Sequence, residues 1–352
     1  MLLGNKELEL PVIQGGMGVG VSLSGLAGAA AACGAMGVIS SANIGFDEPD
    51  FIRAPHESNM KALRKHILRA KEISGGRGLV GVNIMTAVNG YADACRCAVE
   101  AGADAIISGA GLPLKLAELV KGSSTLFAPI VSSAKAAALL CRSYLKHSGI
   151  LPDFFVMEGS RAGGHLGFSE KEISEGSAKT NGELIREVTE AVRPYEEIKG
   201  SPIPVFAAGG VFTAEDVRQS LEAGAAGVQV GTRFIATYEC DASRVFKDVI
   251  TGSRREDIII VKSPVGMPAR AVKTPLLERL AAGESFQPKV CNHCLAACPG
   301  GAKTVYCISR ALIEAVRGNY EEGLFFCGEN AWRVDRLQSV SELIGELTKG
   351  VF

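Results

Sequence analysis

The chain has 352 residues, of which 47% are hydrophobic, so it can bury the core of one large α/β barrel or of two domains. Its 37 basic and 38 acidic residues leave a formal charge of −1, and no run of like charges offers a surface for nucleic acid or an anionic membrane. The first ten residues lack an apolar signal segment, and the Ala-rich stretch 23–36 is too short to span a bilayer. We therefore expect a soluble, cytoplasmic protein with a small-molecule partner.

Eight short apolar runs alternate with longer helical stretches, and each run predicts a β-strand. They are residues 12–14, 37–40, 79–84, 105–108, 129–132, 154–157, 204–208 and 227–231. Because the runs are almost continuously apolar, we expect strands that are buried on both faces, as in a parallel sheet wrapped by helices. Eight such units in this length predict a closed (β/α)8 barrel, the TIM barrel.

The stretches between the runs indicate helices, and several of these end at a glycine. They cover residues 89–101, 133–147 and 213–223, the last beginning with a capping box at Thr213. We expect a barrel domain over 1–240, with polar insertions or lids at 46–76 and 168–200, and a C-terminal appendage over 241–352. In the appendage, 263–268 is expected to be a loop, and 276–281 and 309–317 helices.

Glycines and polar residues follow several of the predicted strands, at the end of a barrel where ligands bind. Gly209-Gly210 and Gly231-Thr232 come after the last two strands, where free backbone N–H groups can hold a phosphate. Gly16-Met17 and Asn83 follow two earlier strands and suit a flat ring. Each of these residues can also be explained structurally, as part of an ordinary turn or, for Met17, as a core residue. Together they indicate a phosphorylated cofactor, and a flavin fits best.

A glycine-rich segment with one histidine follows the sixth strand, reading Arg161-Ala-Gly-Gly-His165. Gly163 and Gly164 let the backbone approach a ligand closely, and His165 places a titratable ring beside it. A lone histidine is often structural, but this one lies at the expected ligand end of the barrel. We therefore expect His165 to be catalytic.

Five segments of the chain resemble the nitronate monooxygenase (2-nitropropane dioxygenase) family, which includes FMN-dependent enoyl-acyl-carrier-protein reductases. The segments are residues 13–18, 82–85, 162–167, 207–210 and 227–234, and they occur in the expected order. The resemblance implies FMN as the cofactor. It implies a phosphate site at Gly209, Gly210, Gly231 and Thr232, a ring site at Gly16, Met17, Asn83, Gly163 and Gly164, and further flavin contacts at Lys135 and Gln229, which also have structural explanations.

The resemblance also implies a reaction. His165 matches the family's active-site histidine, which acts as base on a neutral nitroalkane or holds the oxygens of a nitronate. The expected activity is oxidation of an alkyl nitronate with O2 to a carbonyl compound and nitrite, in a protein that can form a homodimer. Two alternatives stay open: an enoyl-acyl-carrier-protein reductase that uses NAD(P)H, and a flavin-binding redox sensor without turnover.

Arg161 departs from the family pattern, since an acidic residue is usual before Ala-Gly-Gly-His. We expect it to make the cavity entrance more positive and to favour an anion, without identifying the substrate.

Ten cysteines are present, and six of them are scattered along the chain as expected for reduced, buried thiols. The other four form the pattern Cys291-x2-Cys294-x3-Cys298-Pro299 with Cys307 further on. Such spacing can hold zinc or an iron–sulfur cluster, and it can equally serve packing. We assign no metal to it.

Overall fold

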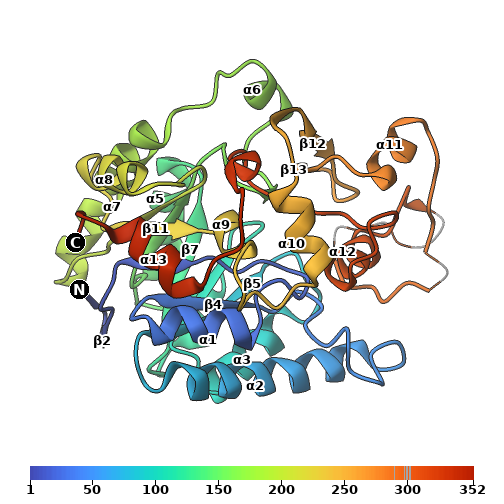
Figure 1. Ribbon diagram of the computed structural model, residues 1–352. Coiled ribbons are helices and arrows are strands. Elements are labelled where there is room, and N and C mark those ends of the chain that lie inside the picture. Colours follow the sequence, from blue (N-terminus) through green and yellow to red (C-terminus); the bar gives the residue numbers. More distant parts are fainter. Residues whose placement is uncertain (289, 297, 299, 301–302) are drawn as a thin grey trace.

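The computed structural model describes residues 1–352 except 289, 297, 299 and 301–302 (Figure 1). Eight parallel strands close into a barrel in the order β10-β11-β3-β4-β5-β6-β7-β8. They are β3 (Val12–Gln14), β4 (Met36–Ser40), β5 (Leu79–Met85), β6 (Ala105–Gly109), β7 (Leu126–Val131), β8 (Phe155–Glu158), β10 (Val205–Ala208) and β11 (Gly227–Val230). Each overlaps one of the eight predicted strands. The (β/α)8 prediction is confirmed.

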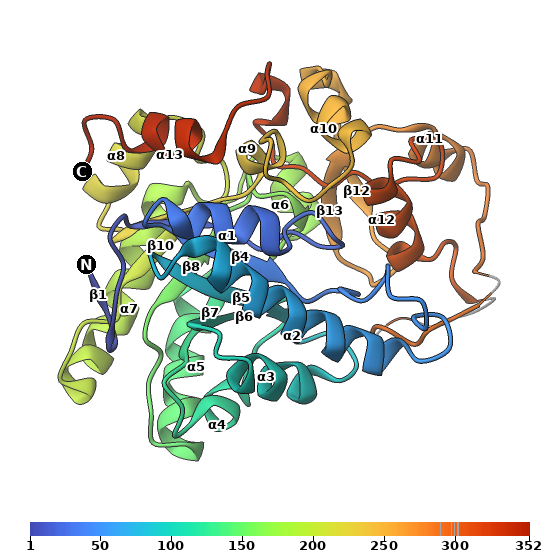
Figure 2. The same cartoon turned by 60° about the horizontal axis from the view of Figure 1, so that its bottom comes forward.

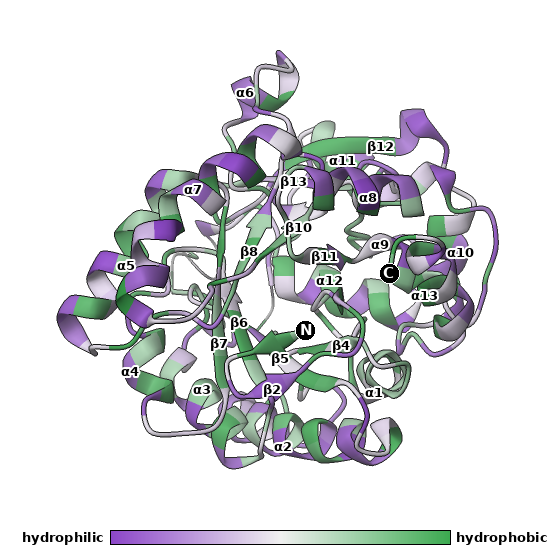
Figure 3. Ribbon diagram, turned by 90° about the vertical axis from the view of Figure 1, so that its left-hand side faces the viewer, coloured by the Kyte–Doolittle hydropathy of each residue, from purple (hydrophilic) through white to green (hydrophobic). Residues whose placement is uncertain are grey.

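Successive side chains of each strand point alternately outward and inward, and both sides of the strand are buried. This explains why the apolar runs are continuous. On β6, Ile106 points outward into the core between strands and helices, whereas Ile107 points inward into the barrel interior. At the bottom of the interior, Phe154 and Phe206 meet edge to face with ring centroids 5.4 Å apart. The hairpin of β1 (Leu2–Leu3) and β2 (Lys6–Glu7) adds Leu3 to the same cluster. Figure 3 shows hydrophobic residues on the strands and many hydrophilic ones on the surrounding helices.

Seven helices follow the first seven barrel strands in turn. They are α1 (Ser24–Ala32), α2 (Pro55–Ser74), α3 (Tyr91–Glu100), α4 (Leu116–Val120), α5 (Ala134–His147), α7 (Asn181–Lys199) and α8 (Ala214–Glu222). No helix among the described residues is long and apolar enough to cross a membrane.

We expected polar insertions at 46–76 and 168–200, and the structure corrects this prediction. Two of these regular helices occupy most of the two ranges. α2 connects β4 to β5 and α7 connects β8 to β10, so both are regular members of the helical ring. They appear polar in the sequence because each buries only one stripe, which in α2 includes Leu63 and Ile67. Within 168–200, the short α6 (Glu170–Ser174) projects from the barrel (Figure 1).

The eighth place in the helical ring is taken by α13 (Val340–Thr348), at the C-terminal end of the chain. α9 (Thr232–Ile235), which directly follows β11, is a single turn, whereas α13 packs between α8 and α1 (Figure 2). The domain boundary expected at residue 240 therefore falls inside the barrel. Residues 241–339 are an insertion between the last strand and the last helix, and we call them the C-terminal insertion.

The described residues of the C-terminal insertion include the helices α10 (Arg244–Thr251), α11 (Pro275–Ala281) and α12 (Ile308–Arg317), and the short 3-10 turns η1 (Arg255–Asp257) and η3 (Ala331–Arg333). The helices expected at 276–281 and 309–317 correspond to α11 and α12. The loop expected at 263–268 joins two strands that were not predicted, β12 (Ile258–Lys262) and β13 (Pro268–Val272). β13 also pairs with β9 (Gly164–His165), so the insertion reaches the histidine segment of the barrel.

Candidate active site

A cavity of about 550 Å³ opens at the carboxyl ends of the barrel strands. Eleven of the twelve predicted site residues line it: Gly16, Met17, Asn83, Gly163, Gly164, His165, Gly209, Gly210, Gln229, Gly231 and Thr232. They come from five strand ends that are far apart in the sequence. The exception is Lys135, which is exposed on the first turn of α5 and is not among the lining residues, although Ser133 and Ala136 are.

Two glycines after β10 shape one end of the cavity. Gly209 and Gly210 both have φ of +87°, a conformation that strongly favours glycine. A Cβ at Gly209 would lie 2.8 Å from the carbonyl oxygen of Gly159, so the space is closed to a side chain. The turn is held by Asn181, whose Nδ2 donates to the Gly209 carbonyl at 2.6 Å, and by Asn330, whose Nδ2 donates to the Gly210 carbonyl at 2.7 Å.

Another part of the cavity wall is formed by the ends of β3 and β5. A Cβ at Gly16 would lie 2.4 Å from the Cβ of Asn83, so glycine is required where these two strand ends meet. The amide of Met17 donates to the Ser22 hydroxyl at 2.8 Å, which fixes the turn after β3. Asn83 donates to the carbonyl of Ile107 at 3.3 Å. Gly16, Met17 and Asn83 are thus held in place on this part of the cavity wall.

His165 is half-buried between the barrel and the C-terminal insertion. Its Nε2 lies 2.8 Å from the Ser263 hydroxyl, and its ring meets Phe326 edge to face, with centroids 5.4 Å apart. Burial lowers the pKa of His165 to about 4, because the imidazolium would lose its hydration there. The ring is therefore neutral at physiological pH and can accept a proton.

Glu158, the last residue of β8, is a second titratable group in the cavity wall that the sequence analysis missed. It forms no ion pair with any residue that the structure describes. Burial raises the pKa of its carboxyl to about 7. Glu158 could have been recognised in the sequence as an acidic residue that ends an otherwise apolar strand.

The C-terminal insertion supplies further lining residues that no local pattern indicated: Met267, Phe326, Cys327, Gly328, Glu329 and Asn330. One of them corrects the expectation for Arg161. The Arg161 Nε lies 2.6 Å from the Glu329 carboxylate, so the extra positive charge at the entrance is balanced by a nearby negative one. The amide of Gly328 also donates to the Thr232 hydroxyl at 2.8 Å, which joins the insertion to the turn after β11.

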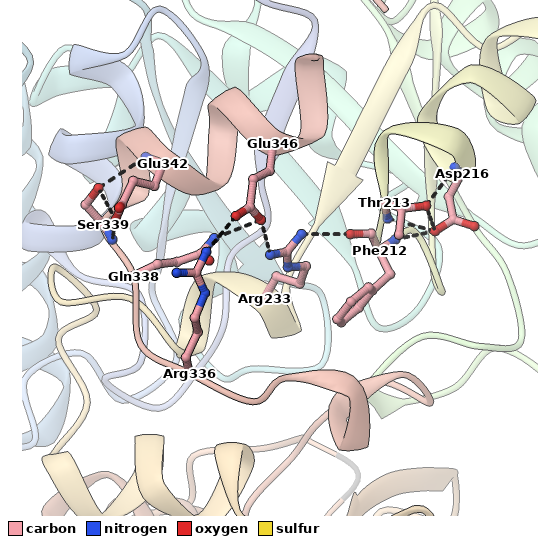
Figure 4. A network of polar contacts seen from close by, with 9 residues as sticks. All are labelled: Phe212, Thr213, Asp216, Arg233, Arg336, Gln338, Ser339, Glu342 and Glu346. Carbon is pink, nitrogen blue, oxygen red and sulfur yellow. Dashed lines mark hydrogen bonds and ion pairs between the residues drawn. The ribbon is translucent and has the colours of Figure 1, made fainter. Parts of the chain in front are cut away.

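A polar network ties the ends of β10 and β11 to the last helix (Figure 4). Arg233 donates to the Phe212 carbonyl at 3.0 Å and pairs with Glu346 of α13 at 2.6 Å. Arg336 binds the other oxygen of the same carboxylate at 3.0 Å. α13 thus helps to hold the two turns that form the glycine-rich end of the cavity.

A second cavity of about 190 Å³ adjoins the first, and the two share lining residues that include Met85, His165, Met267 and Leu312. Its other walls are largely apolar and include Met60, Val88 and Leu295, with His56 and His293 among its polar residues. His165 therefore stands between the two cavities.

The cysteine cluster contributes to the wall of this second cavity through Cys294. The Cys294 thiol lies 2.9 Å from the Ser309 hydroxyl, and burial raises its pKa. The backbone there pairs with the loop after β5, with Asn89 N donating to Cys294 O at 3.0 Å. Among the described residues, no three metal-binding side chains converge, and Pro299 of the motif lies outside them.

A closed (β/α)8 barrel whose strand ends converge on one deep cavity with a neutral histidine has the architecture of a TIM-barrel enzyme. Comparison with known families makes the assignment narrower. The model of the nitronate monooxygenase family matches residues 2–350, and the chain belongs to that family.

A probable nitronate monooxygenase of Staphylococcus aureus (strain Newman) is 32% identical over 136 residues, which is 39% of this chain and 36% of that protein. The match thus spans about a third of the length of this curated relative. Among solved structures, FabK from Thermotoga maritima is 26% identical with a TM-score of 0.73, covering 97% of this chain and 92% of that one. A nitroalkane oxidase from Streptomyces ansochromogenes shares the fold, at 20% identity, a TM-score of 0.72, and coverage of 97% and 95%.

Proposed function

We propose that the protein is an FMN-dependent oxidoreductase that oxidises alkyl nitronates with O2 to a carbonyl compound and nitrite. The observation that carries the proposal is the convergence, in one cavity, of the glycine turns after β10 and β11 with the neutral imidazole of His165. Family membership supports the same reading. When bound, FMN supplies the redox chemistry, while the protein supplies binding, orientation and proton transfer.

The cavity residues fit a flavin phosphate. Gly209 and Gly210 line the cavity without side chains, and their backbone N–H groups would hold the phosphate with Gly231 and the Thr232 hydroxyl. The ring system would lie along Gly16, Met17 and Asn83, close to Gly163, Gly164 and Gln229. The exposed position of Lys135 gives no support to its assignment as a flavin contact, and we leave it out of the proposed site.

His165 has two roles in this proposal. Toward a neutral nitroalkane, the neutral imidazole takes the proton from the carbon that carries the nitro group. Toward a preformed nitronate, a ring N–H donates to a nitronate oxygen and orients the anion. The second cavity, on whose wall His165 also lies, holds the remainder of the substrate.

The test is an anaerobic visible spectrum of the purified protein before and after addition of propyl-2-nitronate, and separately of NADPH. We expect a flavin spectrum that changes with the nitronate and stays unchanged with NADPH. Absence of a flavin spectrum in a protein reconstituted with FMN would contradict the proposal.

The same measurement addresses a second candidate, an NAD(P)H-dependent enoyl-acyl-carrier-protein reductase. The apolar second cavity favours it, because an acyl chain could lie against Met60, Val88 and Leu295. The whole-chain likeness to FabK supports it as well. Rapid bleaching by NADPH alone would favour this reductase over the monooxygenase.

A further inference from the structure

The second cavity has walls of its own beyond the residues that it shares with the first. These walls come from α2, from the loop after β5 and from the C-terminal insertion, through residues that include Met60, Val88 and Leu295. Val88 and Leu295 form an antiparallel bridge, so the barrel and the C-terminal insertion enclose the cavity together. With the first cavity assigned to the flavin, the part of a substrate that extends past His165 enters the second one.

The wall of the second cavity offers little to a charged group. None of the described residues that line it is Asp, Glu, Lys or Arg. Two of its polar side chains already have partners within the protein, since Asn59 accepts from the Gly45 amide at 2.8 Å and the Ser309 hydroxyl lies 2.9 Å from the Cys294 thiol. A carboxylate on the substrate would therefore lose its hydration in this cavity without gaining a strong ion pair.

Two histidines mark the edge of this cavity that faces water. Besides His165, the described lining residues that can become cations are His56 and His293, and both are exposed. His56 Nε2 lies 3.4 Å from the carboxylate of Asp93, and these two side chains are 48% and 46% exposed. A positive charge on His56 is thus balanced by Asp93 and weakened by solvent, so it makes a poor anchor for a substrate anion.

The size and flexibility of the cavity limit what it can hold. Its volume of about 190 Å³ is somewhat larger than the roughly 150 Å³ of an apolar protein cavity that binds benzene. Three methionines, Met60, Met85 and Met267, line it. Methionine side chains are flexible and polarizable, so they adapt to chains and rings of different shape. An uncharged hydrocarbon group therefore fits this cavity, and each buried methylene adds to binding.

We propose that the second cavity is a substrate pocket for an uncharged hydrocarbon chain or ring of roughly six to eight carbon atoms, and that Met60 helps to set the preference for an uncharged group. The identity of the reacting end rests on the proposed function, whereas the chemistry of the cavity is a property of the protein alone. The preferred substrates are then nitronates with a hydrophobic tail, and nitronates that end in a carboxylate are selected against.

Binding is measured by NMR on the FMN-loaded protein with 13C-labelled methionine methyl groups. The chain has seven methionines, and the signal that disappears in Met60→Leu identifies Met60, which lines the second cavity but not the first. We expect 1-hexanol to shift this signal in a saturable way, at concentrations at which sodium hexanoate has no effect. An equal response to both probes, or no response to 1-hexanol, would overturn the proposal.

Substrate preference is measured with two nitronates, those of 1-nitrohexane and of 6-nitrohexanoate, which differ only in a terminal methyl group or carboxylate. We expect kcat/KM to be at least roughly tenfold higher for the nitronate of 1-nitrohexane, because the carboxylate must lose its hydration. Met60→Lys adds a cation to the wall and should reduce or reverse this preference. Equal values for the two nitronates in the unsubstituted protein would overturn the proposal, and an unchanged preference in Met60→Lys would overturn the role of Met60.

Leu68→Lys is the matched control, because it adds the same charge on α2 at a leucine that is 51% exposed and lines neither cavity. It should leave the preference between the two nitronates unchanged. A change as large as that in Met60→Lys would show that net charge acts from a distance, which would also overturn the role of Met60. If neither nitronate is oxidised, the proposed function fails, while the comparison of 1-hexanol with hexanoate still decides the chemistry of the cavity.

Discussion

At the residue scale, Gly210 combines two restrictions, because its φ is +87° and a Cβ would lie 3.0 Å from the Arg161 side chain. Gly210→Asp adds a carboxylate to the proposed phosphate site and should abolish flavin binding through strain and charge repulsion. The measurement is flavin absorbance per chain after gel filtration with FMN. Gly345→Asp, at an exposed helical position with nothing within 4 Å, is the control. A Gly210→Asp protein with a full complement of flavin would remove the phosphate assignment.

The low pKa of His165 predicts the pH dependence of the reaction with a neutral nitroalkane. Because the ring stays neutral down to its pKa of about 4, kcat/KM should remain level from about pH 8 to pH 5 and fall only below that. A fall centred near the ordinary histidine pKa of about 6.5 would contradict a buried base. His165→Ala should keep its flavin and lose roughly 10²-fold or more in turnover. Full turnover in that variant would instead favour a different proton acceptor.

The raised pKa of Glu158 predicts the direction in which the stability of the folded protein changes with pH. Its folded pKa of about 7 lies above the ordinary glutamate pKa of 4.5, so between these two pH values the folded state binds more protons than the unfolded state. Its contribution to stability is therefore fully present below about pH 4.5 and is lost as pH rises through 7. In Glu158→Gln this loss should disappear, which raises the unfolding free energy of the flavin-free protein near pH 8 by roughly 1–3 kcal/mol relative to wild type. Urea unfolding of both proteins at pH 5 and pH 8 provides the comparison, and an identical pH dependence would count against a protonated carboxyl.

At the element scale, α13 completes the helical ring through a small apolar face that includes Leu343, Ile344 and Leu347. Leu343 is fully buried, and Leu343→Ala should cost about 2–5 kcal/mol of unfolding free energy. Leu68→Ala is the matched control, since Leu68 is a helical leucine that is 51% exposed on α2. Denaturant unfolding checks both. Equal, small losses would mean that α13 is an accessory helix.

At the scale of the whole molecule, the order of elements along the chain makes the barrel dependent on its last segment. A fragment of residues 1–240 contains all eight strands but lacks α13, so it leaves the facing surfaces of α1 and α8 uncovered. We expect this fragment to aggregate or to melt without a cooperative transition, because a barrel with one uncovered side exposes its core. Circular dichroism during heating and gel filtration test this. A monomeric fragment with a cooperative melt would restore the boundary at residue 240.

Features with a local signal could be predicted from the amino-acid sequence. Eight continuous apolar runs predicted eight strands because a strand buried on both faces needs apolar residues at successive positions. The sequence also predicted the glycine turns after β3, β10 and β11 and the Gly-Gly-His segment. A turn at a strand end depends mainly on its own residues. Eleven of the twelve predicted site residues consequently lie on one cavity.

Features that depend on contacts between residues far apart in the chain could be seen only in the folded structure. Ser263 contacts His165 across 98 positions, and Glu329 reaches Arg161 across 168. Neither contact can be recognised from a local sequence pattern. Both depend on how the C-terminal insertion packs over the cavity, which the periodicity of its sequence does not determine. The same holds for α13, whose sequence predicts an amphipathic helix but not its place beside α1. The environment of His165, and with it the low pKa of that ring, is therefore a product of the folded molecule.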